Sequence, residues 1–414
     1  MYRRFLTHSI REALEDTPVN ILIGARQTGK STLCHQLQEE QIFPAQMVSL
    51  DDQATLAAVQ TDPLGFLENL NKHLIIDEIQ RGPELFVSIK KLVDQEREER
   101  RILLTGSANV FTLPKVSESL AGRLEIHRLW PLSQDEIIGA RSTFLDQLWS
   151  NQDFSSVKTN WSEIVQAMEI GGYPECLKRK RASRRNKWLE SYISSILQKD
   201  IKDLSNIEGL TQIPNLLHLI GSRVGSNVNI SELSRLSGIK NSTLQRYLAI
   251  LENVFIILRI PAWTPNIEGP FVKSPKIYLN DTGLLCYLRG EDHESLTNNR
   301  IQAGAFFENF VVMELIKQIS WSDTFSKIYH FSMHKGAEVD VVMEDRKKNV
   351  YGIEIKAAST LTKDDFKGLR RLSELSPQFK KGIVLYTGDE YLPFGDKFYA
   401  VPMSALWNPE SHNE

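Results

Sequence analysis

The loop at residues 24–31 constrains the fold of this 414-residue chain more than any other feature. Its sequence, GARQTGKS, matches GxxxxGK[ST] in full and lies between the apolar run VNILI and the helical pattern STLCHQLQ. Glycines let backbone N–H groups converge on phosphate oxygens, and the start of the helix adds its positive end. We therefore predict a phosphate-binding loop made of Gly24, Ala25, Arg26, Gln27, Thr28, Gly29, Lys30, Ser31 and Thr32.

A second motif adds the carboxylates that such a loop requires. The apolar run LII at 74–76 is followed by Asp77 and Glu78, and parallel strands deliver such ends to the same sheet edge as the loop. We expect Lys30 to reach the β and γ phosphates, Ser31 and Asp77 to hold Mg²⁺, and Glu78 to polarise the attacking water. Together the two motifs predict a site that hydrolyses a nucleotide, with ATP and Mg²⁺ as its ligands.

Two further segments belong to this prediction. The apolar run ILLTGS ends in the polar residues Thr105 and Ser107, with Asn109 just beyond, and these are suited to contact the γ-phosphate or the water. Arg123 is a candidate arginine finger that acts on a neighbouring subunit. Its other interpretation is an ordinary surface arginine in a loop.

Composition limits the class of protein. Apolar residues make up 41% and charged residues 24% of the chain, which excludes a wholly disordered protein. The net charge of −3 means that any nucleic-acid contact has to come from local patches. Three widely spaced cysteines exclude a disulfide framework and fit a reducing compartment. Without a signal peptide or an apolar run of 18 residues, the chain is expected to be soluble and cytoplasmic.

The patterns along the chain predict four units. Apolar strands alternate with helices in residues 1–150, which predicts an α/β domain with a parallel sheet covered on both faces. A helical linker or lid is expected at 151–205 and a winged helix at 206–270. A second α/β domain is expected at 271–414. The predicted fold class is thus α/β at both ends of the chain with a helical middle.

A helix–turn–helix pattern lies in the third unit. NISELSRLSG at 229–238 reads as a short helix that glycine stops, and the next helix has apolar residues at 244, 247, 248 and 251 on one face. A strand pattern follows, which gives winged-helix order. If this unit reads DNA, the residues facing the groove are Lys240, Ser242, Thr243, Gln245 and Arg246. A packing module that touches no DNA is the alternative.

Four charged residues interrupt apolar patterns near the C-terminus. Glu308 lies in a helical pattern, Asp340 in the strand AEVDVVME, and Glu354 and Lys356 in the strand YGIEIKAA. Such charges are costly to bury unless they are paired or bound to a metal. We predict that Glu308, Asp340 and Glu354 bind Mg²⁺ or Mn²⁺ and that Lys356 orients or deprotonates a water. A structural Glu354–Lys356 ion pair and a fold that binds DNA without cutting remain open.

The ordered motifs LDD, IIDEIQ, LLTGSA, LAGR, PLS and GGYPE resemble those of a prokaryotic AAA-type ATPase family. Members of that family carry a C-terminal domain of unassigned function with nuclease-like motifs. The resemblance spans nearly the whole chain and implies an AAA-type core, a ring-shaped homo-oligomer such as a hexamer, and action of Arg123 in trans. The C-terminal order of Glu308, Asp340 and the E-x-K strand is similar to the PD-(D/E)xK nuclease superfamily, although Val339 stands where a proline is expected.

Three functions follow from these patterns. The leading hypothesis is an ATP-driven protein that binds DNA and cuts it at a metal-dependent C-terminal site. The second is a nucleotide-switched regulatory or scaffold ATPase whose nuclease-like domain binds but does not cut. The third is a protein-remodelling ATPase that touches no nucleic acid. DNA affinity that falls steeply with salt separates the first from the third, and metal-dependent cleavage separates the first from the second.

Overall fold

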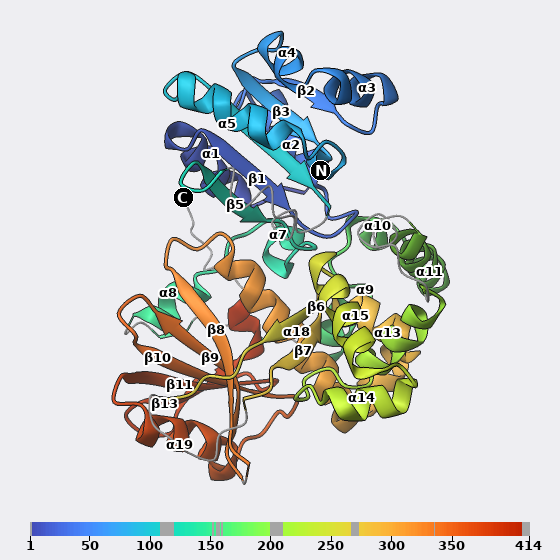
Figure 1. The fold of residues 1–414 in the computed structure, drawn as a ribbon. Helices are drawn as coiled ribbons and strands as arrows, with labels where there is room; N and C mark the ends of the chain where they lie inside the picture. Colours follow the sequence, from blue (N-terminus) through green and yellow to red (C-terminus); the bar gives the residue numbers. More distant parts are fainter. Residues whose placement is uncertain are drawn as a thin grey trace.

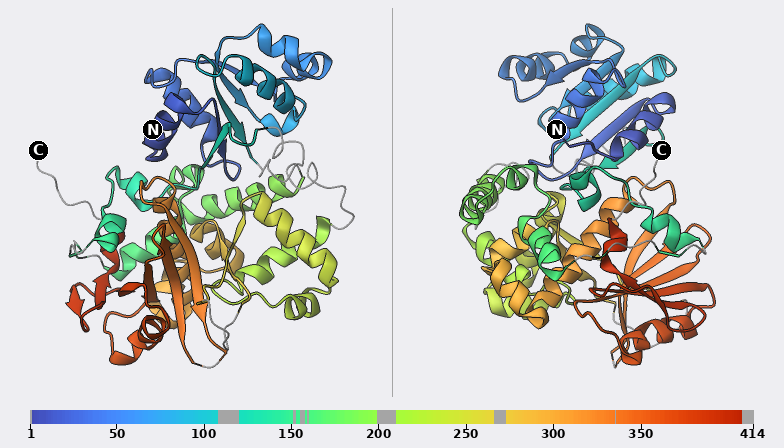
Figure 2. Two further views of the ribbon diagram at one scale, coloured as in Figure 1. Left: turned by 60° about the vertical axis from the view of Figure 1, so that its left-hand side comes forward. Right: turned by 180° about the vertical axis from the view of Figure 1, so that it is seen from behind.

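The computed structural model describes residues 2–107, 120–150, 153–154, 158, 160–198, 210–265, 273–334 and 336–407. An N-terminal α/β domain, a helical middle part and a C-terminal α/β part follow one another along the chain (Figure 1). The N-terminal domain lies above the other two parts, which lie side by side below it (Figures 1 and 2). Asn109 lies outside the described residues.

The N-terminal sheet has five parallel strands in the order β2-β3-β4-β1-β5. Its strands are β1 (Val19–Ile23), β2 (Gln46–Ser49), β3 (His73–Asp77), β4 (Arg101–Gly106) and β5 (Leu124–Arg128). Its helices are α1 (Leu6–Asp16), α2 (Lys30–Glu39), α3 (Gln53–Thr61), α4 (Pro63–Glu68), η1 (Ile79–Arg81) and α5 (Leu85–Gln95). The predicted parallel sheet is confirmed.

Alternate residues of these strands enter two different cores. Leu22 packs with the apolar residues of α1 and α2, whereas Ile21 and Ile23 pack with those of α5. Because strand side chains alternate between faces, a nearly continuous apolar strand is buried on both sides. The sheet is therefore covered by helices on both faces. A binding site can form only where the C-terminal ends of its strands meet the loops that follow them.

The middle part is helical. It contains α7 (Gln134–Ile138), α8 (Phe144–Trp149), α9 (Trp161–Ile170), α10 (Pro174–Leu177), α11 (Ala182–Gln198), η3 (Leu210–Gln212), α13 (Ile213–Gly221), α14 (Ile230–Ser237) and α15 (Asn241–Asn253). Strand β6 (Ile257–Ile260) follows α15 and pairs antiparallel with β7 (Lys276–Leu279). The pairing joins segments on both sides of residue 270, where the sequence patterns place a domain boundary.

The C-terminal part is a six-stranded mixed sheet in the order β12-β13-β11-β10-β9-β8. Its strands are β8 (Ser326–Ser332), β9 (Glu338–Asp345), β10 (Val350–Lys356), β11 (Phe379–Tyr386), β12 (Leu392–Pro393) and β13 (Phe398–Pro402). Its helices are α16 (Thr282–Arg289), α17 (His293–Asn298), α18 (Arg300–Ile319), η4 (Lys363–Phe366), α19 (Lys367–Leu375) and η5 (Met403–Leu406). Strands β9 and β10, which carry Asp340 and Glu354, pair antiparallel as a hairpin.

One apolar core connects all three parts. Ile21 of β1, Leu217 of α13 and Ile353 of β10 belong to the same cluster of buried side chains. A second cluster covers the opposite face of the C-terminal sheet, where Leu369 and Leu372 of α19 pack. Within the described ranges, no helix combines the length and the apolar character needed to cross a membrane.

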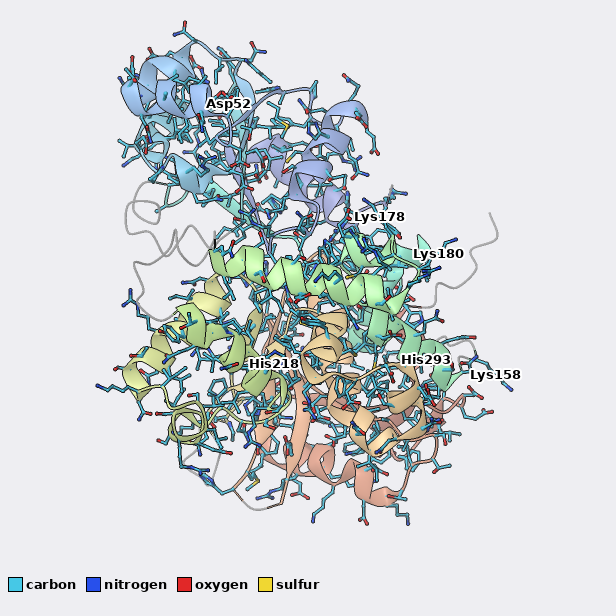
Figure 3. The ribbon with its side chains drawn as sticks, turned by 90° about the vertical axis from the view of Figure 1, so that its right-hand side faces the viewer. Asp52, Lys158, Lys178, Lys180, His218 and His293 are labelled. Atoms are coloured by element: carbon cyan, nitrogen blue, oxygen red, sulfur yellow. The ribbon has the colours of Figure 1, made fainter. Side chains whose placement is uncertain are left out.

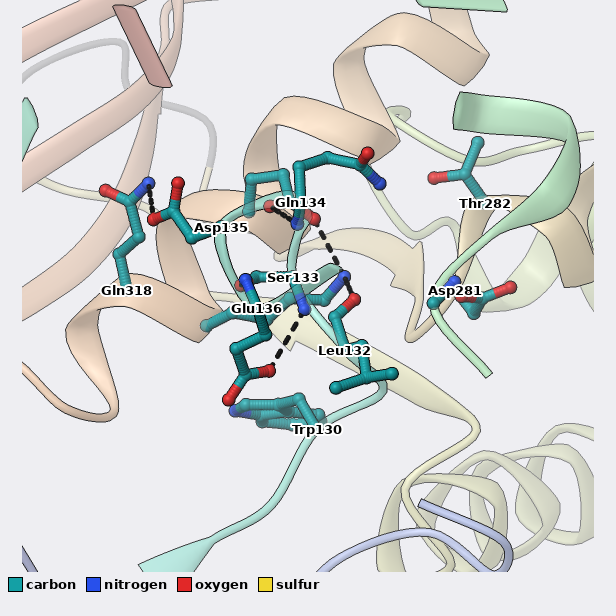
Figure 4. Close-up of polar contacts among 12 residues, drawn as sticks. Trp130, Leu132, Ser133, Gln134, Asp135, Glu136, Asp281, Thr282 and Gln318 are labelled. Atoms are coloured by element: carbon teal, nitrogen blue, oxygen red, sulfur yellow. Dashed lines mark hydrogen bonds and ion pairs between the residues drawn. The ribbon is translucent and has the colours of Figure 1, made fainter. Parts of the chain in front are cut away.

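The N-terminal domain is joined to α18 by buried polar contacts around α7 (Figure 4). Ser133 and Glu136 form a capping box at the start of α7. The N–H of Gln134 donates to Glu314 Oε2 at 2.8 Å, and Gln318 Nε2 donates to Asp135 Oδ2 at 3.3 Å. These bonds hold α7, which follows β5 in the chain, against α18 of the C-terminal part.

Asp135→Asn should stabilise the protein increasingly as the pH rises. Burial, together with the charge of Glu314, raises the pKa of Asp135 to about 8. A folded-state pKa above the unfolded value means that this carboxyl favours folding in acid and loses that contribution as the pH rises toward 8. The asparagine has no such loss, so its stability advantage should grow by about 2 kcal/mol between pH 6 and pH 8. Urea unfolding curves at the two pH values measure it, and a pH-independent difference would contradict it.

Candidate functional site

The phosphate loop connects the end of β1 to the start of α2. Gly29 precedes α2 with φ of 98°, a backbone conformation that glycine adopts without strain. A Cβ on Gly24 would lie 2.2 Å from the carbonyl oxygen of Leu129, so no side chain fits there. The Thr28 hydroxyl donates to the carbonyl of Ala25 at 2.9 Å and closes the loop.

Lys30 lies at the centre of this loop. Its ammonium donates to the carbonyl oxygens of Gly24 and Ala25, both at 3.0 Å, and its side chain is buried. A buried ammonium next to the start of a helix favours the binding of an anion. This is the position in which the sequence places the phosphates.

The Mg²⁺ prediction depends on Ser31 and Asp77, and the structure brings them together. The Ser31 hydroxyl lies 3.1 Å from both carboxylate oxygens of Asp77. Thr105, at the end of β4, also donates its hydroxyl to Asp77. Hydroxyl and carboxylate oxygens are the ligands that Mg²⁺ prefers. The residues present therefore fit a Mg²⁺ ion that is held together with a nucleotide.

Glu78 follows Asp77 in the left-handed region, with φ of 59°. Its N–H donates to the Thr105 hydroxyl at 3.2 Å, and its carboxylate accepts a hydrogen bond from Gln80. Gln80 also donates to the Ser107 hydroxyl at 3.1 Å, so Gln80 connects Ser107 to Glu78. Burial raises the pKa of Glu78, which makes its carboxylate a stronger base.

A cavity of about 830 Å³ opens beside these groups. The predicted residues that line it are Arg26, Gln27, Thr28, Gly29, Lys30, Ser31, Thr32 and Glu78. Gly24 and Ala25, the first two residues of the loop, do not line the cavity. Their carbonyl oxygens accept hydrogen bonds from Lys30. The far wall comes from Tyr2 and Arg4 of the N-terminal segment and from Pro174, Glu175 and Lys178 of the α10 region. That wall was not predicted from the sequence.

Arg4 shows how the wall is fixed. Its guanidinium is buried and donates to the carbonyl of Thr28 at 2.9 Å, to the carbonyl of Trp130 at 2.6 Å and to Glu136 at 3.0 Å. An arginine so close to the N-terminus carries no local signal of this role, because its three partners are distant in sequence.

Arg123 lies at the opposite end of the sheet from the loop of its own chain. Its carbonyl accepts the N–H of Val19 at the start of β1, whereas the loop follows the other end of that strand. Its guanidinium pairs with Asp94 on α5. Arg123 therefore cannot reach the phosphate loop of the same chain.

The sequence predicts that four charged residues of the C-terminal part form one site, and the structure places them together. Glu308, Asp340, Glu354 and Lys356 line a pocket of about 590 Å³. Lys356 Nζ lies 2.8 Å from Glu354 Oε1, and Asp340 Oδ2 accepts the N–H of Ile355 at 3.0 Å. The other carboxylate oxygen of Glu354 is buried without a hydrogen-bond partner.

Lys276 of β7 occupies the centre of this pocket, which the sequence did not predict. Its ammonium lies 3.0 Å from Glu308 Oε1, 2.7 Å from Glu338 Oε1 and 3.0 Å from Asp340 Oδ1. Only 1% of its side chain is exposed. Tyr278, two positions along the same strand, donates its hydroxyl to Glu308 at 2.7 Å.

In this structure an ammonium lies among the carboxylates that are predicted to bind Mg²⁺ or Mn²⁺. The oxygens that would bind the ion already bind an ammonium, and that ammonium supplies the positive charge. In the part of the chain that the structure describes, no group of three or more His, Cys, Asp and Glu side chains is placed to hold a metal. The cation beside Glu308 and Asp340 in this structure is thus a lysine that the sequence did not predict, and the metal site stays a prediction.

The electrostatics of the pocket agree with a tight charge cluster. Burial and the nearby Asp340 raise the pKa of Glu308 to about 7 and that of Glu354 to about 8. Burial alone would lower the pKa of Lys276, but Asp340, Glu308 and Glu338 hold it well above its ordinary value. Lys276 is therefore charged throughout the neutral range.

The helix–turn–helix prediction falls on α14, α15 and the strand β6. Gly238 ends α14 with φ of 70°, as its glycine stop predicts. The buried residues of α15 include all four of its predicted apolar positions, Leu244, Tyr247, Leu248 and Leu251. Lys240, Ser242, Gln245 and Arg246 are exposed, and Thr243 is half-buried. The predicted DNA-facing residues thus share the outer surface of this unit.

The basic run at 178–187 is divided between two roles. Arg185 is buried and pairs with Glu169 at 2.8 Å, and Arg179 pairs with Glu175 at 2.8 Å. Lys178 and Lys180 are exposed beside the N-terminal domain (Figure 3). Part of the run therefore supports the fold, and part forms a charged surface near the mouth of the cavity.

Three protein-family models match the chain in succession. Residues 16–138 match one described as "AAA domain", residues 162–295 match "Domain of unknown function (DUF8612)", and residues 303–406 match "Domain of unknown function (DUF4143)". Together with the loop, the Asp77–Glu78 pair and the parallel sheet, the first match identifies the N-terminal part as an AAA-type ATPase domain that uses ATP.

Relatives and solved structures were also found. The uncharacterized protein Rv2008c of Mycobacterium tuberculosis is 28% identical over 413 residues, which are 100% of this chain and 86% of that protein. An uncharacterized protein of Haemophilus influenzae is 22% identical over 72% of this chain and 74% of its own.

Two of the similar solved structures are AMPPCP-bound DnaA from Aquifex aeolicus and the RuvB Holliday junction branch migration motor of Thermotoga maritima. They are 16% and 19% identical and cover 59% and 62% of this chain and 86% of each of theirs. With a TM-score of 0.28 in both cases, neither likeness extends what the matched family model shows.

Proposed function

We propose that this chain hydrolyses ATP and uses its nucleotide state to control the binding of DNA. The observation that carries the proposal is the meeting of Lys30, Ser31, Asp77 and Glu78 at one end of a single sheet, beside a cavity of about 830 Å³. Cavities of 300–1,000 Å³ are the usual size of small-molecule sites.

The proposed reaction is attack of water on the γ-phosphorus of ATP. The water oxygen forms the new P–O bond, the bond from the γ-phosphorus to the bridging oxygen breaks, and ADP leaves. Lys30 neutralises charge on the phosphates, and Glu78 accepts the proton of the water. Ser31 and Asp77 would hold a Mg²⁺ ion, and such an ion would supply positive charge beside the phosphate oxygens.

The proposed DNA contact is the outer surface of α14 and α15. Exposed Lys240 and Arg246 supply positive charge, and Ser242 and Gln245 supply hydrogen-bonding groups at the start of α15. A recognition helix that enters the major groove presents residue types of this kind. Lys240 and Arg246 would neutralise phosphates, so affinity would fall with rising salt.

Duplex DNA binding in ATP and in ADP, at 50 and 200 mM salt, tests the proposal. We expect tighter binding in one nucleotide state, and we expect Lys240→Glu and Arg246→Glu to weaken binding and to flatten the salt dependence. Lys158→Glu is the matched control, because Lys158 is exposed away from α14 and α15 (Figure 3). Equal loss in all three variants would show only a charge effect, and no binding in any state would refute the DNA contact.

A second candidate function is metal-dependent cleavage of DNA at the C-terminal pocket. It is favoured by the meeting of Glu308, Asp340, Glu354 and Lys356 in one pocket. It requires Lys276 to leave the carboxylates first, and for that reason it ranks below binding without cleavage. Incubation of single-stranded, duplex and branched DNA with Mg²⁺ or Mn²⁺ decides between the two. Cleavage that Asp340→Asn abolishes would support the second function, and intact DNA in every case would remove it.

The proposed assembly is a homo-oligomeric ring, for example a hexamer, in which Arg123 reaches the ATP of a neighbour. Arg123 cannot serve its own loop, so a role in hydrolysis requires another subunit. We expect Lys30→Ala and Arg123→Ala proteins to be inactive alone and to regain part of the ATPase activity when mixed. The mixed interface pairs an intact loop with an intact arginine. No recovery in a preparation that exchanges subunits would leave Arg123 as the partner of Asp94 alone.

A further inference from the structure

We propose that Tyr192 positions the phosphate loop and, through Tyr173 and Asn280, couples that loop to the C-terminal pocket. The inference rests on the proposed ATP site and adds a route by which the two ends of the chain influence each other. Helix α11, which carries Tyr192, lies directly below the N-terminal domain (Figure 3).

Hydrogen bonds connect the loop to the end of β7. Tyr192 donates its hydroxyl to the carbonyl of Arg26 at 3.1 Å, and its oxygen lies 2.8 Å from the hydroxyl of Tyr173. Asn280 Nδ2 donates to the Tyr173 oxygen at 2.8 Å. A hydroxyl has a single proton, so Tyr173 donates to Tyr192 and the sense of the chain is fixed from Asn280 to Arg26.

Because the three side chains are buried, the loss of any of these hydrogen bonds is costly. Tyr173 and Asn280 are fully buried, and Tyr192 is 4% exposed. Water cannot easily replace a lost partner there, and an unsatisfied buried polar group carries the full cost of its desolvation. The Tyr192 ring stacks on Trp188 and the Tyr173 ring packs against it, so the hydroxyl groups have little freedom.

Strand β7 extends the connection to the pocket. Asn280 directly follows β7, and residues 276 and 278 lie on the same face of that strand because strand side chains alternate. Lys276 and Tyr278 bind Glu308 at 3.0 and 2.7 Å. The segment 276–280 therefore contacts Glu308 of the pocket through two side chains, and it contacts Tyr173 through a third, that of Asn280.

The loop end of this chain is placed to sense the nucleotide. Arg26 lines the cavity, so a shift of the loop on phosphate binding moves the carbonyl that Tyr192 binds. In the other direction, a change at Glu308 or Lys276 moves β7 and alters the support of the loop. Coupling between two sites is reciprocal in binding free energy, so it can be measured from either end.

A double-mutant cycle on nucleotide affinity tests the proposal. Tyr278→Phe removes the hydroxyl bond to Glu308, and Tyr192→Phe removes the bond to Arg26 while both rings stay. The Kd of a non-hydrolysable ATP analogue is measured for wild type, both single variants and the double variant. We expect Tyr278→Phe to change the Kd about fivefold or more in the wild-type background and less than about twofold in the Tyr192→Phe background.

Hydrogen exchange provides a readout that a local stability loss does not give. We expect the analogue to slow amide exchange in β7 and α18 of the wild type, and to lose this effect in Tyr192→Phe. Tyr399→Phe is the control, because its hydroxyl also donates to a backbone carbonyl, that of Asp396, two strands from β10. This control should keep the nucleotide effect.

The outcomes separate the coupling from the ATP site itself. Binding of the analogue with the same Tyr278→Phe effect in both backgrounds, or with no effect in either, would overturn the coupling and leave the ATP site standing. A wild-type protein that binds no analogue would overturn both.

Discussion

Glu78→Gln protein should bind ATP with nearly wild-type affinity and hydrolyse it about 10²–10⁴-fold more slowly. The glutamine keeps the size of the side chain and can still accept the hydrogen bond from Gln80. It cannot take a proton from water. Because burial raises the pKa of Glu78, the wild-type carboxylate is a better base than an exposed one, and its loss should be felt fully in kcat.

Lys30→Ala should have the opposite signature, with ATP affinity lost first. The variant removes the buried ammonium at the centre of the loop. The carbonyl oxygens of Gly24 and Ala25 would then lie near the phosphates with no positive charge between them. Calorimetric titration with ATP and a phosphate-release assay separate the two signatures. Glu68→Gln, which changes an exposed carboxylate of α4, is the control. Normal turnover in Glu78→Gln would refute its role as base.

Lys276→Met should destabilise the protein by about 3–5 kcal/mol, because it leaves several carboxylates around an uncompensated buried site. Glu308, Glu338 and Asp340 all lose the same partner. A triple variant that adds Glu308→Gln and Asp340→Asn should recover much of the loss, because neutral amides need no cation. Lys348→Met removes the ion pair of an exposed lysine with Glu344 and should cost much less stability than Lys276→Met.

Mg²⁺ gives the complementary test in the absence of ATP. We expect no rise in the wild-type Tm, because Lys276 already neutralises the pocket, and a rise in Lys276→Met by mass action. Urea and thermal unfolding with and without Mg²⁺ measure both effects. A wild type that Mg²⁺ stabilises, with the effect lost in Asp340→Asn but kept in Asp77→Asn, would mean that the lysine yields to the metal. The cleavage function would then take first place.

The N-terminal site was predictable because each of its parts is a short motif of consecutive residues. The loop at 24–31 and the Asp77–Glu78 pair each follow a strand, and a parallel sheet brings strand ends together whatever their order. The order itself was not predictable. The position of β4 between β1 and β3, which lets Thr105 bind Asp77, is set by packing across the whole sheet.

The C-terminal pocket shows the limit of local patterns more clearly. Charged residues in apolar strands drew attention to Asp340, Glu354 and Lys356, and the structure places them together. Lys276 was missed although it also lies in an apolar strand pattern beside Tyr278. Its carboxylate partners are 32, 62 and 64 residues away, and only the fold decides whether a buried carboxylate meets a metal or an amine.

The three matched segments look separable in sequence, yet the apolar core that runs from β1 through α13 to β10 ties them into one thermodynamic unit. Cutting the chain after residue 150 would expose on each fragment the apolar surface that the other now covers. The protein should therefore melt in a single cooperative transition, and an isolated ATPase fragment should aggregate rather than work alone. An engineered exchange of one segment between relatives therefore has to include the apolar surface on which that segment packs.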